Sequence, residues 1–149
     1  MPMSAAQNTE VLLVEDNPHD AELTLIALKK KGIDENVFLV RDGAEALDFL
    51  MGKGAYTGVR SMTPLKLVLL DLKLPKLNGF EVLEEIRKHA EFSTMPVVIH
   101  SSSAVEADIQ RAYDLGANSY IVKPINFHEH SVALSESVYY WKTYNQTLI

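Results

Sequence analysis

The strongest constraint in this sequence is that short apolar runs alternate with longer amphipathic stretches along nearly the whole chain. Five runs have the length of a strand, and we predict strands at 10–15, 37–40, 66–70, 97–100 and 119–122. The first, third and fourth are almost continuous Val, Leu and Ile, a composition typical of strands that are covered on both faces. Strands that alternate with helices in this way predict an α/β fold with a doubly wound parallel sheet.

The stretches between the strands carry the end signals of helices. Asn17-Pro18 provides an N-cap and a first-turn proline for a helix that we expect to end near Gly32. Four further helices are expected from Gly43, after Asn78-Gly79, over 105–115 and after Asn126, where Glu129 completes a capping-box pattern. The segment 52–64 holds three glycines and is expected to be a surface loop.

Length and composition indicate a single globular domain, which we place at residues 10–145 with tails at 1–9 and 146–149. The chain has 149 residues, of which 47% are hydrophobic, and no cysteine for a disulfide framework. No apolar run approaches the roughly 20 residues that cross a bilayer, and the N-terminus lacks the pattern of a signal peptide. We therefore expect a cytoplasmic protein with no membrane contact. The net charge of -6 argues against nucleic acid as a direct ligand.

Reactive side chains follow the predicted strands at the edge of the sheet where α/β proteins bind ligands. Glu15-Asp16 ends the first strand, Asp71 the third, Ser101 the fourth and Lys123 the fifth. Taken singly, an acid after a strand is more often a helix cap or a turn residue. Three carboxylates in one cleft repel one another, however, and a divalent cation removes that conflict. An all-oxygen site suits Mg²⁺, and a carboxylate beside Mg²⁺ can attack a phosphoryl group.

Four sequence motifs, in this order, resemble those of a two-component response-regulator receiver domain. They are LLVEDN at 12–17, DGAEAL at 42–47, LLDLKLP at 69–75 with Asn78-Gly79, and YIVKP at 120–124. The resemblance extends over residues 10–144. It implies a flavodoxin-like (βα)5 fold whose five parallel strands have the order 2-1-3-4-5.

The resemblance also implies a role for each residue at the sheet edge. Asp71 would accept a phosphoryl group from a phosphohistidine on a partner histidine kinase. Asp16, Asp71 and the backbone carbonyl of Lys73 would bind Mg²⁺, and Glu15 would contribute directly or through water. Lys123 would pair with the phosphoryl oxygens. Such a protein is not an enzyme, because it catalyses only its own phosphorylation and dephosphorylation.

Two residues would carry the signal away from the acceptor. By resemblance, the Ser101 hydroxyl would move to bind one phosphoryl oxygen, and Tyr120 would turn inward as Ser101 moves. Tyr120 is equally well interpreted as a half-buried aromatic residue of the last strand.

The 25 residues after Pro124 fit one helix and a short tail, so we expect the signal to leave by protein contact. Phe127, Leu134, Val138 and Trp141 follow helical spacing and are expected to face the core. Further aromatic residues around the same helix predict a homodimer, with Tyr139, Tyr140, Trp141 and Tyr144 in its interface. This tail and the 52–64 segment also resemble regulators that are paired with phytochrome-type histidine kinases.

Three alternative functions share parts of this pattern. An aspartate-nucleophile phosphohydrolase usually has a second acid two residues after the nucleophile, where this chain has Lys73. A flavodoxin-like electron carrier would bind the FMN phosphate after the first strand, where Glu15-Asp16 would repel it. A pseudo-receiver that never takes phosphate stays open as a binding module, although such proteins usually lack one of the acids or the lysine.

Overall fold

The computed structural model describes residues 6–59, 64–123, 125 and 127–148, with the side chains of 127–131 excepted. Five strands form one sheet: β1 (Val11–Val14), β2 (Val37–Val40), β3 (Leu67–Leu70), β4 (Val97–Ser101) and β5 (Ser119–Val122). Neighbouring strands are parallel, and their order is β2-β1-β3-β4-β5. Each end lies within one residue of its prediction, so the predicted strands and the flavodoxin-like fold are confirmed.

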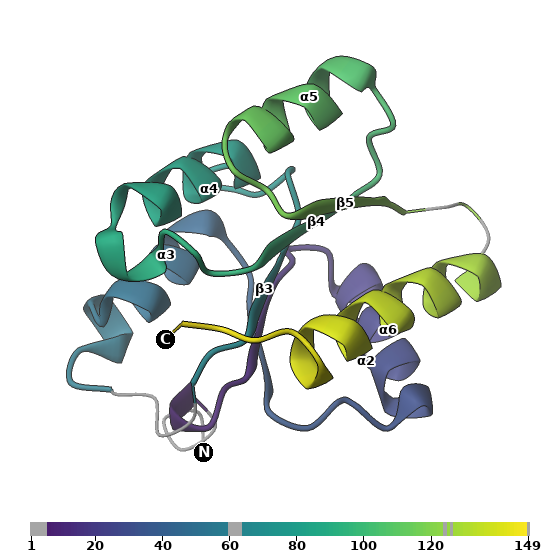
Figure 1. The fold of residues 1–149 in the computed structure, drawn as a ribbon, viewed down its shortest axis with the longest axis horizontal. Helices are drawn as coiled ribbons and strands as arrows, with labels where there is room; N and C mark the ends of the chain where they lie inside the picture. Colours follow the sequence, from purple (N-terminus) through teal and green to yellow (C-terminus); the bar gives the residue numbers. More distant parts are fainter. Residues whose placement is uncertain (1–5, 60–63, 124, 126, 149) are drawn as a thin grey trace.

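The helices cover both faces of this sheet, as Figure 1 shows. They are α2 (Pro18–Lys31), α3 (Gly43–Met51), α4 (Gly79–Lys88), α5 (Glu106–Asp114) and α6 (Phe127–Thr143), with 3-10 turns η1 (Gly54–Tyr56) and η2 (Ala90–Phe92). One face packs against α3, α4 and α5, and the other against α2 and α6. The chain thus has two cores that share the central strands, which explains why β1, β3 and β4 are buried at every position.

The predicted end signals of the first helices act as capping contacts. The Asn17 side chain accepts hydrogen bonds from the backbone amides of His19 and Asp20 at 2.9 and 3.1 Å. Gly32 closes the same helix in the left-handed conformation, with φ 76°. Asn78 and Glu81 form a complete capping box on α4. The predicted capping box at Asn126 lies outside the described residues, as does the side chain of Phe127.

The prediction that 52–64 is a surface loop is wrong for its first part. Residues 54–56 form the 3-10 turn η1, and Tyr56 is buried. Its ring packs edge-on against Phe38 and Phe49, and its hydroxyl donates to Glu45 at 2.8 Å. The glycines therefore serve the turn, while the tyrosine anchors it to β2 and α3. Residues 60–63 lie outside the described part of the chain.

The C-terminal helix is fixed to the rest of the domain by two lysines. Leu134 and Val138 are fully buried in the second core, as predicted, and Trp141 packs against it. The Lys142 ammonium donates to the backbone carbonyls of Ile33 and Glu35 at 3.2 and 2.6 Å. Lys66 in turn donates to the carbonyl of Lys142 at 3.2 Å. Among the described residues, no helix is long and apolar enough to cross a membrane.

The predicted N-terminal tail includes residues that pack on the domain. Ala6 and Thr9 are buried, and the Thr9 hydroxyl donates to the carbonyl of Ala6 at 2.9 Å. The domain boundaries at residues 10 and 145 stay predictions.

Replacing Gly79 with alanine should destabilise the fold by displacing the loop between β3 and α4. A Cβ atom at this position would collide with the Asp71 carbonyl oxygen and with the Leu72 Cα. Backbone atoms cannot rotate away as a side chain can, so we expect a loss of about 1–3 kcal/mol in the free energy of unfolding. Urea denaturation measures this change. An unchanged urea midpoint would show that the loop between β3 and α4 can shift to accept the extra methyl group without loss of stability.

Candidate functional site

The sheet register places the ends of β1 and β3 at one level, and β4 and β5 extend two residues beyond it at the same edge of the sheet. The amide of Asp71 donates to the Val14 carbonyl at 3.1 Å, and the amide of Lys123 donates to the Ser101 carbonyl at 2.7 Å. The side chains that follow these strands therefore converge. The Lys123 ammonium lies 2.6 Å from Glu15 Oε1 and 3.0 Å from Asp71 Oδ2. Residues that lie 52 and 108 positions apart in the sequence thus meet in one polar cluster.

Backbone amides hold two of these carboxylates in place. Asp71 Oδ1 accepts from the amide of Leu72 at 2.7 Å and from the amide of Lys73 at 3.4 Å. Glu15 Oε2 accepts from the amide of Asn17 at 3.2 Å, just before α2 begins. Each carboxylate therefore offers one oxygen to the backbone and the other to Lys123. This arrangement fixes their orientation before any ligand arrives.

Glu15, Asp16 and Asp71 could hold a metal ion together. One carboxylate oxygen from each lies within 4.8 Å of the others. Glu15 and Asp71 are buried, and Asp16 is exposed, so the cluster opens to solvent on the side of Asp16. The structure thus brings together the three carboxylates that the sequence predicted as ligands. The role of the Lys73 carbonyl in that set stays a prediction.

The cluster contains more carboxylates than its one lysine, Lys123, can neutralise. Burial raises the pKa of Glu15 to about 7, and the neighbouring Asp71 charge adds to the shift although Lys123 opposes it. For Lys123, burial disfavours the charged form, but the carboxylates of Asp71 and Glu15 outweigh it and raise its pKa above the usual range. Lys123 therefore stays protonated, while the carboxylates of Glu15 and Asp71 repel each other.

A fourth carboxylate, from Asp20, also reaches Lys123, although Asp20 is not among the predicted site residues. Asp20 Oδ2 lies 3.1 Å from the ammonium. Asp20 is in the first turn of α2, three residues after the N-cap Asn17, and points back toward the sheet edge. Its position in that turn is the one signal that could have identified it.

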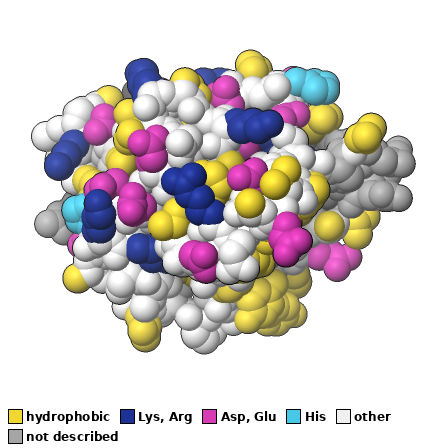
Figure 2. All heavy atoms as spheres, turned by 90° about the horizontal axis from the view of Figure 1, so that it is seen from above, with side chains coloured by type: hydrophobic (Ala, Val, Ile, Leu, Met, Phe, Trp, Pro, Cys, Tyr) yellow, Lys and Arg dark blue, Asp and Glu magenta, His cyan; other side chains and the backbone are white. Residues whose placement is uncertain are grey.

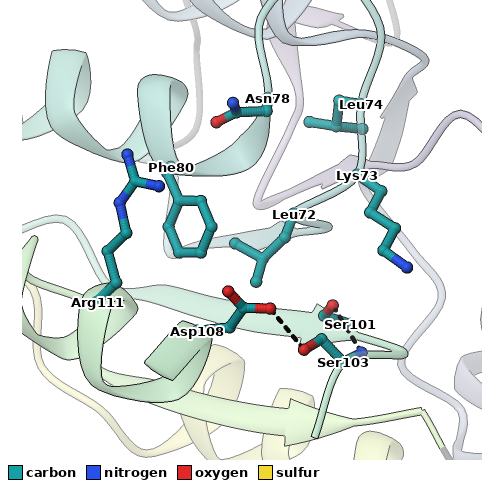
Figure 3. Close-up of a pocket in the computed structure, with 9 residues that line it drawn as sticks. All are labelled: Leu72, Lys73, Leu74, Asn78, Phe80, Ser101, Ser103, Asp108 and Arg111. Atoms are coloured by element: carbon teal, nitrogen blue, oxygen red, sulfur yellow. Dashed lines mark hydrogen bonds between the residues drawn. The ribbon is translucent and has the colours of Figure 1, made fainter. Parts of the chain in front are cut away.

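Ser101 is fully buried beside a cavity of about 380 Å³. Figure 3 shows this cavity between the β3–α4 loop and α5, with Ser101, Ser103 and Asp108 on one side. The amide of Ser103 donates to Ser101 Oγ at 3.1 Å, and the Ser103 hydroxyl donates to Asp108 at 2.6 Å. The Ser101 oxygen is therefore held as an acceptor by the residues that follow β4, and its own O–H group can still donate to a ligand.

Tyr120 is joined to the same loop. Its hydroxyl donates to the backbone carbonyl of Ser103 at 2.9 Å, and its ring packs against the first core. The tyrosine is thus half-buried, as the simpler interpretation expects, and also contacts the loop that follows Ser101. A movement of that loop would break or re-form this bond.

The fold and the edge cluster together define a class of phosphoacceptor domain. Residues 11–134 match the family model described as response regulator receiver domain, and the chain belongs to this family. It is a phosphoacceptor of two-component signalling, as the motifs predicted.

Two curated relatives and two solved structures illustrate this similarity. The probable methanogenesis regulatory protein FilR2 of Methanothrix harundinacea is 38% identical, covering 92% of this chain and 86% of that protein. The response regulator Rcp1 of Synechocystis sp. is 40% identical, covering 80% of this chain and 79% of Rcp1. The phosphorylated cyanobacterial phytochrome response regulator RcpA superposes with a TM-score of 0.85 at 35% identity, covering 95% and 99% of the two chains.

The Mn²⁺-bound form of Rcp1 bears on the acidic cluster. It superposes with a TM-score of 0.83 at 34% identity, covering 93% of this chain and 98% of that chain. A relative with this fold thus binds a divalent cation, and the three clustered carboxylates of this chain form a site that could bind one too.

Proposed function

We propose that Asp71 is the residue that accepts the phosphoryl group, with a partner histidine kinase as the donor. The observation that carries this proposal is the position of its carboxylate, which is the only one of the three clustered acids that bonds both to Lys123 and to two successive amides among the described contacts. Those donors orient the nucleophile and balance negative charge as it develops. The reaction is the protein's own phosphorylation, with no separate substrate.

The transfer forms one bond and breaks one. A carboxylate oxygen of Asp71 attacks phosphorus, the bond from phosphorus to the histidine nitrogen breaks, and the electron pair of that bond returns to the imidazole. Lys123 lies 3.0 Å from the Asp71 carboxylate and can follow the transferred oxygens with its ammonium. The buried Ser101 hydroxyl would donate to a further oxygen as the residues after β4 move, and Tyr120 would respond to that movement.

The donor set supports Mg²⁺ as the cation. Glu15, Asp16 and Asp71 present only oxygen atoms, and the open side at Asp16 leaves space for water, which Mg²⁺ retains in proteins. Together with the carbonyl of Lys73, these residues would hold the ion. When bound, Mg²⁺ would neutralise the excess charge of the acids and of the incoming phosphoryl group.

The test of this proposal is intact-mass analysis after incubation with a small phosphodonor, with and without Mg²⁺. One added phosphoryl group is expected in the native protein with Mg²⁺, and none in Asp71→Asn. Asp42→Asn is a matched control, because it changes an acid that caps α3. No addition to the native protein would favour the pseudo-receiver, a binding module that works without phosphate.

The partner that best fits the relatives is a phytochrome-type histidine kinase. RcpA is described as a phytochrome response regulator, and its solved chain is covered almost completely by this one. The name of FilR2 refers to methanogenesis, so relatives of similar identity serve different signals. Phosphotransfer from a purified phytochrome-type kinase should be faster than from an unrelated histidine kinase. Equal rates would remove the reason for this pairing.

The surface supports protein contact as the output. On the face seen in Figure 2, Lys and Arg side chains are interspersed with Asp and Glu rather than gathered in one basic patch. Tyr140 on α6 is 49% exposed, and Tyr144, in the turn directly after this helix, is 62% exposed. Tyr139 and Trp141 pack partly against the second core. A homodimer built on this helix would bury the exposed rings.

The double variant Tyr140→Ser/Tyr144→Ser is expected to shift that dimer toward a monomer. The reason is the loss of two aromatic rings from the centre of the interface, where such residues contribute most of the binding energy. Light scattering coupled to size exclusion measures the mass. Tyr113→Ser is the control, because Tyr113 is 45% exposed on α5. A native monomer in both phosphorylation states would exclude the dimer.

A further inference from the structure

Lys123 contacts one carboxylate, that of Asp20, to which the proposed phosphorylation assigns no role. Its ammonium lies within 3.1 Å of oxygens from Glu15, Asp71 and Asp20. An ammonium group has three N–H donors, so these three carboxylates use all of them. Asp20 is also not among the residues that could share a metal ion, since that group consists of Glu15, Asp16 and Asp71. Its one described side-chain contact is with Lys123.

The backbone holds Asp20 at this place. The Asn17 side chain accepts from the amide of Asp20 at 3.1 Å, and this cap fixes the first turn of α2. The turn begins directly after Glu15-Asp16, so the helix starts at the edge of the cluster. The contact with Lys123 therefore follows from how the helix is capped.

We propose that Asp20 is a positioning residue, the counter-ion that holds Lys123 in the unphosphorylated protein and is released when a phosphoryl group on Asp71 takes the ammonium. This inference rests on the proposed function of Asp71 and Lys123. In this proposal Asp20 opposes phosphorylation, whereas the other residues of the site favour phosphorylation.

The exposure of the three carboxylates indicates which bond to Lys123 breaks. To follow the oxygens of a phosphoryl group, the ammonium has to move outward from Asp71, and its bonds to the three acids resist that movement. The Glu15 side chain is 1% exposed, so leaving it would strand a buried charge. The Asp20 side chain is 35% exposed and would be hydrated on release. Its bond is therefore the one that is lost at the lowest cost.

The charge of Asp20 acts in the same direction. A phosphoryl group brings further negative charge to Asp71, and the Asp20 carboxylate repels it across the shared lysine. Asp20 thus stabilises the unphosphorylated state through Lys123 and destabilises the phosphorylated one. Removing its charge should shift the equilibrium toward the phosphoryl-bearing state.

The experiment is a titration with fluoroberyllate, a stable mimic of a phosphoryl group on a carboxylate, at saturating Mg²⁺. Saturation removes any effect of Asp20 on metal affinity, and ¹⁹F NMR counts the bound mimic directly. Asp20→Asn is expected to bind it about two- to fivefold more tightly than the native protein, the range of a partly exposed ion pair. Asp20→Ser should do the same, and Asp20→Glu, which restores the charge, should return toward the native affinity.

Glu22→Gln is the matched control, because it removes one negative charge from an exposed position on the same helix. It should leave the affinity near the native value. Unchanged or weaker binding in both neutral Asp20 variants would overturn the inference, and so would an equal gain in Glu22→Gln. If the native protein binds no fluoroberyllate, the proposed function itself fails, and the inference falls with it.

Discussion

Lys123→Met is expected to lose about 3 kcal/mol of folding stability in EDTA at pH 8 and, in Mg²⁺, to take up phosphoryl groups roughly 100-fold more slowly. The stability loss follows from the buried carboxylates of Glu15 and Asp71, which without a cation between them would either repel each other or take up a proton that the unfolded chain does not bind at this pH. The loss of rate follows from the missing partner for the phosphoryl oxygens. Urea denaturation and time-resolved intact-mass analysis measure the two effects.

Adding Mg²⁺ distinguishes the role of Lys123 in folding stability from its role in phosphoryl transfer. Because a divalent cation can neutralise the same carboxylates, it should recover most of the stability of Lys123→Met, but not the rate. Lys88→Met is the control, since Lys88 forms a surface pair with Glu85 at 3.0 Å and such pairs contribute little. If Lys123→Met in EDTA were as stable as the native protein, the acids would not depend on this lysine for charge compensation.

The parts of the site that the sequence could predict are those that strand ends determine. Asp71 follows a strand of purely aliphatic residues, and Lys123 follows an apolar run of strand length. Because parallel strands end at the same edge of a sheet, both residues could be placed at that edge. The same holds for Glu15 and Ser101. Their convergence needs only the strand order, which the receiver resemblance implied and the structure confirms.

The parts that it could not predict depend on the path of the chain between elements. Asp20 reaches Lys123 because the first turn of α2 lies at the edge of the cluster, and helical periodicity contains no information on that placement. Tyr56 is buried because the 3-10 turn folds back onto Phe38 and Phe49. A segment with three glycines gives no periodic signal for such a return.

Long-range contacts to backbone carbonyls are equally invisible in the sequence. The Arg87 guanidinium donates to the carbonyls of Gly116 and Phe92 and to the Asn118 side chain, which joins α4 to the segment before β5. Every residue has a carbonyl, so nothing in the residue types marks these acceptors. Only the folded chain shows which carbonyls turn toward an arginine.

Glu15→Gln is expected to stabilise the metal-free protein at pH 8 by about 1–2 kcal/mol, and to lose that advantage as the pH falls. Burial raises the pKa of Glu15 to about 7 in the folded state, against 4.5 for an ordinary glutamate. The folded protein therefore holds this proton more tightly than the unfolded chain. Between these two values, lowering the pH stabilises the native protein, and above about 7 the ionised Glu15 is a cost that glutamine does not carry.

The same substitution should weaken Mg²⁺ binding by roughly tenfold or more, because it removes a charged oxygen from the cluster. The free energy of unfolding is measured by urea denaturation at pH 5 to 8, in EDTA and in saturating Mg²⁺. In Mg²⁺ the order should reverse, with the native protein the more stable of the two, since bound metal requires the ionised acid. Glu84→Gln, an exposed change on α4, controls for the loss of one charge. Parallel pH curves for Glu15→Gln and the native protein in EDTA would mean that Glu15 is already ionised at no cost, and that the excess of acids over Lys123 is relieved elsewhere in the cluster.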